Sequence, residues 1–73
     1  MFSKDNFVMR INCLMAVNKT TKQALADYIG IKRPSVSQIC HGVNLPSIET
    51  LVSIAEYFNV SVDYLLGLTE DTK

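Results

Sequence analysis

The sequence predicts an all-α domain of five short helices. Five segments carry apolar residues at the 3.6-residue spacing of a helix face, and the polar connections between them are only two to six residues long. No segment alternates apolar and polar residues with the period of two that is typical of a half-buried strand. With 73 residues the chain suits a single domain, residues 1–73, with one hydrophobic core.

The first predicted helix covers residues 5–17 and carries one apolar stripe at i, i+4 and i+7: Phe7, Ile11 and Leu14. The second begins near Lys22, after a polar stretch in which Thr20 and Gln23 have the spacing of a capping box. It ends at Gly30, because glycine readily takes the left-handed conformation just beyond a helix end.

The third helix begins around Arg33, and Pro34 is tolerated there because the first turn of a helix leaves its N–H groups unpaired. Gly42 ends this helix. One of its faces is apolar and suits the core: Val36, Ile39 and Cys40. The opposite face is polar and is expected to stay open to a partner: Ser35, Ser37, Gln38 and His41.

Two further helices complete the predicted fold. Ser47 is a good N-cap for the fourth, and Glu49 in its first turn complements the helix dipole. Asn59 ends the fourth helix, and Ser61 caps a fifth of little more than one turn. Residues 69–73 are expected to form a loose tail.

Size and composition argue against an enzyme. Small-molecule sites usually need about 300 Å³ of concavity or more, and no nucleophile is arranged with a base, so neither enzymatic activity nor a cofactor is expected. Cys13 and Cys40, with a single histidine, match no zinc pattern, so we expect no metal and two reduced, buried thiols. No apolar stretch approaches the ~20 residues that cross a bilayer, and residues 1–10 lack the apolar region of a signal peptide. A cytoplasmic protein without a membrane partner is expected.

Charge divides the chain although its formal net charge is zero. The part up to Pro34 holds six cations and two acids, a net charge of +4, and the remainder has a net charge of −4. If the fold keeps these parts on different faces, one surface attracts polyanions while the other repels them. The alternative is scattered, solvated charge.

Residues 22–41 have the pattern of two helices that cross at a steep angle, with Ala26 as the small residue at the crossing and Gly30 in the turn. This pattern resembles the helix-turn-helix of the Cro/CI-like, or XRE-type, family of repressors. Flanking segments resemble the same family in the same order and extend the resemblance over residues 7–67: Arg10-Ile11 with Leu14, Pro46 to Leu51, and Asn59 to Leu66. The resemblance implies a five-helix, lambda-repressor-like DNA-binding domain.

The chain departs from the family at two positions that belong together. Many members join the first helix to the end of the third through a buried Arg–Glu pair, and the matching residues here are Met15 and Cys40. Both charges are replaced at once. We therefore expect the two side chains to pack against each other in the core, without the desolvation cost of a buried ion pair.

Base contacts are expected from the start and the polar face of the third helix, which suits the major groove of DNA. Arg33, Ser37 and Gln38 lie at i, i+4 and i+5 on one face, and Lys32 flanks them. Arg33 matches guanine O6 and N7 as a bidentate partner, and Gln38 matches adenine N6 and N7. The alternative for these residues is an ordinary solvated surface.

Phosphate contacts are expected at the start of the second helix, where free amides and the helix dipole favour an anion: Thr21, Lys22 and Gln23. Relatives often have Gln at the position of Lys22, and the lysine replaces a directed hydrogen bond by a point charge. The resemblance places three secondary candidates on the same side: Ser35, His41 and Asn44.

The resemblance implies a sequence-specific transcriptional regulator that binds double-stranded DNA as a symmetric dimer, because one domain of this size contacts about half of an operator. Dimer contacts are expected after the third helix, since association through the cationic part would bring like charges together: Val43, Leu45, Val62 and Tyr64. The free protein is expected to be largely monomeric and to form its homodimer on the operator. The competing function is an antitoxin-like or other protein-interaction module.

Overall fold

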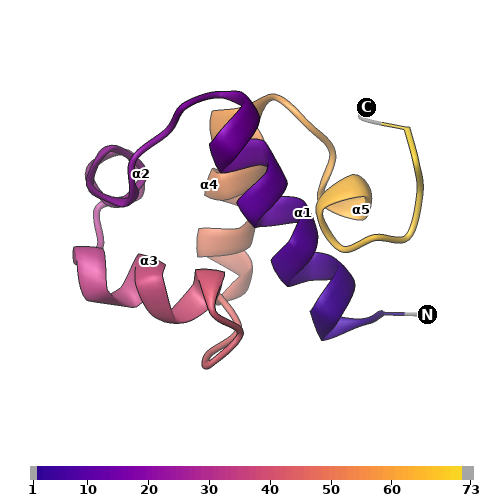
Figure 1. The fold of residues 1–73 in the computed structure, drawn as a ribbon, viewed down its shortest axis with the longest axis horizontal. Helices are drawn as coiled ribbons and strands as arrows, with labels where there is room; N and C mark the ends of the chain where they lie inside the picture. The colour runs from indigo at the N-terminus through magenta and orange to yellow at the C-terminus, as the bar shows by residue number, and fades with distance from the viewer. Residues whose placement is uncertain (1, 72–73) are drawn as a thin grey trace.

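The computed structural model describes residues 2–71, and this part of the chain contains five helices and no strand (Figure 1). The helices are, in order, α1 (Lys4–Val17), α2 (Lys22–Ile29), α3 (Arg33–Cys40), α4 (Ile48–Phe58) and α5 (Val62–Leu65). In Figure 1, α1 lies in front of α4, with α2 and α3 on one side of this pair and α5 on the other. The predicted all-α class and the five helices are confirmed.

Hydroxyl side chains start four of the five helices, each accepting a hydrogen bond from a backbone N–H in the first turn: Ser3, Thr21, Ser47 and Ser61. The predicted capping box of α2 is wrong by one residue. Thr21 accepts from the Ala24 N–H at 3.0 Å, whereas the Thr20 N–H donates to the Met15 carbonyl and so closes the end of α1. Gln23 does not return to the cap, because its side-chain amide donates to Asp27 at 2.8 Å.

Left-handed residues end α2 and α4, as the sequence predicts. Gly30 has φ 87° and its N–H donates to the Ala26 carbonyl at 2.8 Å. Asn59 has φ 56°, and asparagine is one of the few side chains that tolerate this region. These two short turns fix the directions in which α3 and α5 leave the preceding helices.

One hydrophobic core holds the helices together. All five helices contribute to it, and α3 supplies three of its buried residues. Ala26 of α2 is fully buried in this core, so a larger side chain there would have to displace the packed side chains around it. The buried residues are Phe7, Ile11, Met15, Leu25, Ala26, Val36, Ile39, Cys40, Ile54, Ala55, Phe58 and Leu65.

Met15 and Cys40 pack against each other in this core, as predicted. Met15 Sδ and Cys40 Sγ are 3.5 Å apart, and both residues are buried. Burial raises the pKa of the Cys40 thiol, and the positive charge of Lys22 opposes that rise. The expectation that both cysteines are buried is wrong for Cys13, which is exposed on the outer face of α1.

Arg10 ties α1 to the end of the chain. Its guanidinium lies 4.1 Å from the centre of the Tyr64 ring, donates to the Tyr64 and Thr69 carbonyls at 3.3 Å, and forms a 2.7 Å salt bridge with Glu70. These contacts reach the first two residues of the segment that was expected to be a loose tail. Thr72 and Lys73 in that segment lie outside the described residues.

The described residues contain neither a membrane-spanning helix nor a candidate metal cluster. No helix among residues 2–71 is long and apolar enough to cross a membrane. The same residues contain no group of three or more His, Cys, Asp or Glu side chains placed to hold a metal ion.

Candidate nucleic-acid interface

All four predicted base-contacting residues lie on α3 or at its start: Lys32 is the N-cap, and Arg33, Ser37 and Gln38 belong to the helix. Lys32, Arg33 and Gln38 are exposed and Ser37 is half-buried, while the opposite face of the same helix is buried in the core. Ser37 Oγ lies 3.4 Å from His41 Nδ1, one turn further along, so these two side chains form a pair on the surface. The helix therefore presents an open polar face that begins with two cations.

The start of α3 differs from the start of every other helix. Lys32 occupies the N-cap position without a side-chain capping bond, and no acidic residue lies in the first turn. A helix N-terminus carries a partial positive charge, which Lys32 and Arg33 increase and which nothing in this turn neutralises. An anion bound here would remove this repulsion.

The predicted phosphate-contacting residues at the start of α2 lie together and also lack an acid in the first turn. Thr21 Oγ1 is occupied as the cap, and the Gln23 amide is held by Asp27, so both side chains already have partners. Lys22 is half-buried, and its charge acts on the Cys40 thiol near the end of α3. The positive charge of Lys22 therefore acts near the C-terminal end of α3.

The secondary phosphate candidates separate into two groups. Ser35 and Asn44 line a groove of about 380 Å³ with Gln38, between α3, the α3–α4 connection and the start of α4. His41 lies outside this groove and pairs with Ser37. Asn44 is not free either, because its side-chain amide donates to Gln38 Oε1 at 2.7 Å.

Lys4 is a cation on this side of the molecule that the sequence did not single out. Its Cε lies close to Gly42, within 3.8 Å of the position that a Cβ atom of that glycine would occupy, and the residue is exposed. Lys4 therefore adds positive charge beside the end of α3. Its basic side chain in the first turn of α1 was the signal available in the sequence.

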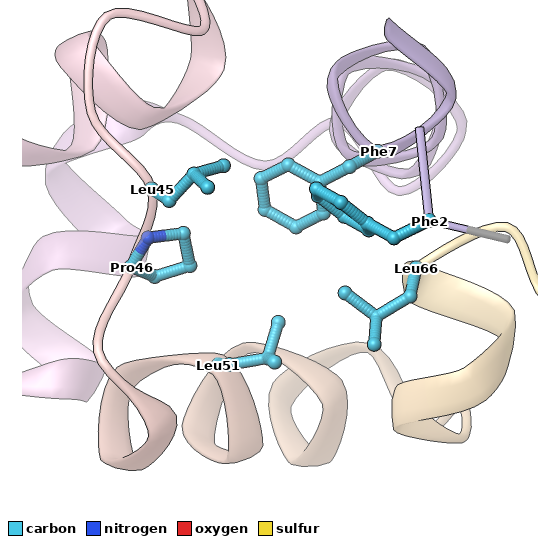
Figure 2. Close-up of a pocket in the computed structure, with 6 residues that line it drawn as sticks. All are labelled: Phe2, Phe7, Leu45, Pro46, Leu51 and Leu66. Carbon is cyan, nitrogen blue, oxygen red and sulfur yellow. The ribbon is translucent and has the colours of Figure 1, made fainter. Parts of the chain in front are cut away.

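The predicted dimer residues do not form one uniform surface. Val43 and Leu45 are 68 % and 53 % exposed, whereas Val62 is half-buried against the core and the Tyr64 ring is covered on one side by Arg10. The α3–α4 connection and the end of α5 nevertheless meet at an apolar cavity of about 140 Å³. Leu45 points into this cavity from one side and Leu66 from the other (Figure 2). Its lining residues are Phe2, Phe7, Leu45, Pro46, Leu51 and Leu66.

Sequence reasoning missed a second apolar feature on α4. Ile48 is 80 % exposed and Val52 is 41 % exposed, one turn apart on the side of α4 that does not face the core. The signal was present, because both residues lie off the buried stripe of that helix. An exposed apolar pair beside Val43 and Leu45 in the chain extends the surface available to a protein partner.

Comparison with known families decides the assignment. A family model described as Helix-turn-helix matches residues 18–65, which contain α2, α3, α4 and α5 in full. The chain belongs to this helix-turn-helix family. The resemblance to its Cro/CI-type members is confirmed, and so is the expectation that the chain is no enzyme, because the family consists of regulators.

Three curated relatives match this helix-turn-helix chain. It is 37 % identical to the uncharacterized HTH-type transcriptional regulator YobD of Bacillus subtilis over 65 residues, 89 % of this chain and 58 % of the relative. It is 44 % identical to the cryptic phage CTXphi transcriptional repressor RstR of Vibrio cholerae over 52 residues, 71 % of this chain and 46 % of the relative. It is 42 % identical to the uncharacterized HTH-type transcriptional regulator YqaE of Bacillus subtilis over 48 residues, 66 % of this chain and 41 % of the relative.

The chain therefore spans about half the length of the curated relatives that it matches. No solved structure matches it significantly.

Proposed function

We propose that this helix-turn-helix chain is a sequence-specific transcriptional regulator, a repressor that acts in the cytoplasm and binds a two-fold operator in double-stranded DNA as a dimer. The observation that carries the proposal is the start of α3, where Lys32 and Arg33 reinforce an uncapped helix N-terminus at the edge of an open polar face. A helix of this kind fits the major groove, which is about 12 Å wide and presents a different pattern of donors and acceptors for each base pair.

The remaining charges support binding of a polyanion. Arg10 is engaged by Glu70, but the other five cations in the described part of the chain form no salt bridge there: Lys4, Lys19, Lys22, Lys32 and Arg33. Three of them belong to α2 or to the start of α3. They are free to neutralise phosphates and to release the counterions that accompany them.

The test is a salt-dependent gel shift with the DNA upstream of the gene for this chain, compared with a random duplex of the same length. We expect a retarded complex that forms at lower protein concentration on the upstream DNA and weakens steeply as salt rises. Equal binding to both duplexes at every salt concentration would contradict sequence-specific recognition.

Lys22→Ala is expected to weaken binding to specific and random DNA about equally. Lys22 would act as a point charge on a phosphate, so its loss removes about one released counterion and lowers the salt slope by about one unit. The measurement is affinity against salt concentration for both duplexes. Lys22→Gln, which restores the residue frequent in relatives, is the matched control and should recover binding with the lower salt slope. An unchanged slope in Lys22→Ala would remove Lys22 from the phosphate contacts.

The dimer is proposed to use the α3–α4 connection, through the exposed Val43 and Leu45, and α5, through Val62 and Tyr64. Support comes from the cavity that joins the two segments and from the cations on α2 and α3, which would repel a second copy. Such an interface is small, so the two copies would associate mainly when both half-sites of an operator hold them together.

Leu45→Ala and Tyr64→Ala are expected to keep affinity for a single half-site but to lower cooperativity on a two-fold operator by about tenfold or more. Both changes remove apolar contact area without adding charge near DNA. Sedimentation with and without operator DNA measures the association, and Met9→Ala, at an exposed apolar residue of α1, is the control. Wild-type cooperativity in both folded variants would place the interface elsewhere, with Ile48 and Val52 as the next surface to test.

We favour the regulator over an antitoxin-like protein-interaction module. The three relatives described above all carry the name of a transcriptional regulator or repressor. Self-association on DNA, as proposed above, would also use the exposed apolar residues.

A further inference from the structure

Gln38, on the open face of α3, is hydrogen-bonded to the α3–α4 connection through both its backbone and its side chain. Its backbone carbonyl accepts the N–H groups of Val43 at 2.9 Å and Asn44 at 3.4 Å, just beyond the end of the helix. Its side-chain Oε1 accepts the Asn44 side-chain amide at 2.7 Å. Asn44 is therefore anchored to Gln38 through its backbone and holds the Gln38 side chain through its own amide.

The hydrogen bond from Asn44 determines which end of the Gln38 amide is available to a partner. Oε1 is directed to the α3–α4 connection, and one of its two lone pairs is occupied. Nε2 has no acceptor among residues 2–71, although Gln38 is exposed. The side chain thus presents an N–H₂ group with two donors and keeps its acceptor turned toward the protein.

We infer that Asn44 is a positioning residue that sets the base preference of Gln38, and that Gln38 reads an edge with acceptors, guanine in preference to adenine. This inference rests on the proposed function, because it requires α3 to lie in the major groove. It differs from the expectation based on residue type alone, in which Gln38 pairs with adenine.

The chemistry of the two purine edges explains the preference. A glutamine that reads adenine must accept from N6 with Oε1 while Nε2 donates to N7, so both ends of the amide must face the base. Guanine offers two neighbouring acceptors, O6 and N7, and the two donors of one N–H₂ group match them. When Asn44 holds its oxygen, the Gln38 amide can donate to both acceptors of guanine. Opposite adenine, the same amide leaves the N6 donor unpaired.

The Asn44→Asp substitution reverses the orientation while changing almost nothing in size. An aspartate only accepts hydrogen bonds, so it pairs with Gln38 Nε2 and turns Oε1 outward. Gln38 would then present an acceptor and favour a base with an exposed amino group, cytosine N4 or adenine N6. Asn44→Ala removes the hold altogether and leaves the amide free to rotate.

The experiment is selection of bound duplexes from a random library, followed by affinity measurements on duplexes that differ at one base pair. The Gln38→Ala variant identifies the base pair that Gln38 contacts, because base preference should disappear at that position of the operator. At this position we expect wild-type protein to favour guanine over adenine by roughly tenfold, Asn44→Ala to lose most of this ratio, and Asn44→Asp to invert it. Each variant is checked for a wild-type melting temperature, and ratios at one position are unaffected by the general repulsion that an added carboxylate causes.

The outcomes separate the inference from the proposed function. Failure of wild-type protein to enrich any sequence refutes the proposed function, and the inference fails with it. An enriched operator that prefers adenine at the Gln38 position, or that has no position sensitive to Gln38→Ala, refutes the inference alone. If Asn44 had a purely structural role, its variants would lose the same affinity on all duplexes. Unchanged base ratios in both Asn44 variants would therefore also refute the inference.

Discussion

Met15→Arg is expected to lower the free energy of unfolding by several kcal/mol, about 3–5 kcal/mol if the guanidinium remains buried without a partner. Met15 is 8 % exposed and packs on the buried Cys40, with the two sulfur atoms 3.5 Å apart. An Arg there must either lose its hydration or force α1 away from α3. Thermal and urea unfolding measure the loss, and Met15→Leu is the matched control because it nearly conserves volume and should cost less than about 1.5 kcal/mol.

The double variant Met15→Arg, Cys40→Glu distinguishes a missing partner from a steric effect. It restores at these two positions the charges found in many relatives, so it should recover much of the stability lost in Met15→Arg. Cys40→Glu alone should be milder than Met15→Arg, because the Lys22 charge acts on this position. No measurable loss of stability in Met15→Arg would show that its side chain escapes to solvent and that the site is not sealed.

The helix positions were predictable because their signals are local. Ser47, Ser61 and Gly30 act through hydrogen bonds or backbone angles within four residues, so their neighbours in sequence are sufficient to recognise them. The cap of α2 was assigned to the wrong residue because Thr20 and Thr21 are both hydroxyl residues. The choice between them depends on the path of the chain leaving α1, where the Thr20 N–H is already bound to Met15.

Long-range contacts explain what the sequence did not predict. Arg10 was counted with the cationic part of the chain, yet its salt bridge joins it to Glu70, sixty residues away. No periodicity or motif reports such a pair, because it depends on how α1 packs beside α5.

The candidate site shows the same division between local and long-range information. Helical periodicity places Gln38 on the open face of α3, whereas Arg33 is exposed because it lies in the first turn of the helix. The hydrogen bond between Gln38 and Asn44 was not foreseen, since it depends on the turn that follows Gly42. Residue type alone indicated which bases the side chains could match, whereas the orientation of the Gln38 amide required the structure.

Arg33→Ala is expected to weaken binding to the operator by about 1–3 kcal/mol, or roughly 5- to 150-fold, while binding to random DNA changes much less. Arg33 is exposed in the first turn of α3, and no carboxylate in the described part of the chain pairs with it, so its five donors are available to a base edge. Guanine O6 and N7 match the guanidinium fork, and no other base offers two acceptors at this spacing in the major groove.

The measurement is the affinity of Arg33→Ala for three kinds of DNA: the operator, operators changed at one base pair, and a random duplex. Preference should relax at a single guanine. Arg33→Lys is the control that separates charge from geometry, because lysine keeps the positive charge but lacks the planar fork. It should therefore retain binding to random DNA and still lose most of the preference for that guanine. If Arg33→Ala instead loses the same factor on every duplex and Arg33→Lys restores it fully, Arg33 contacts phosphate, and base readout by α3 rests on Gln38 and its neighbours.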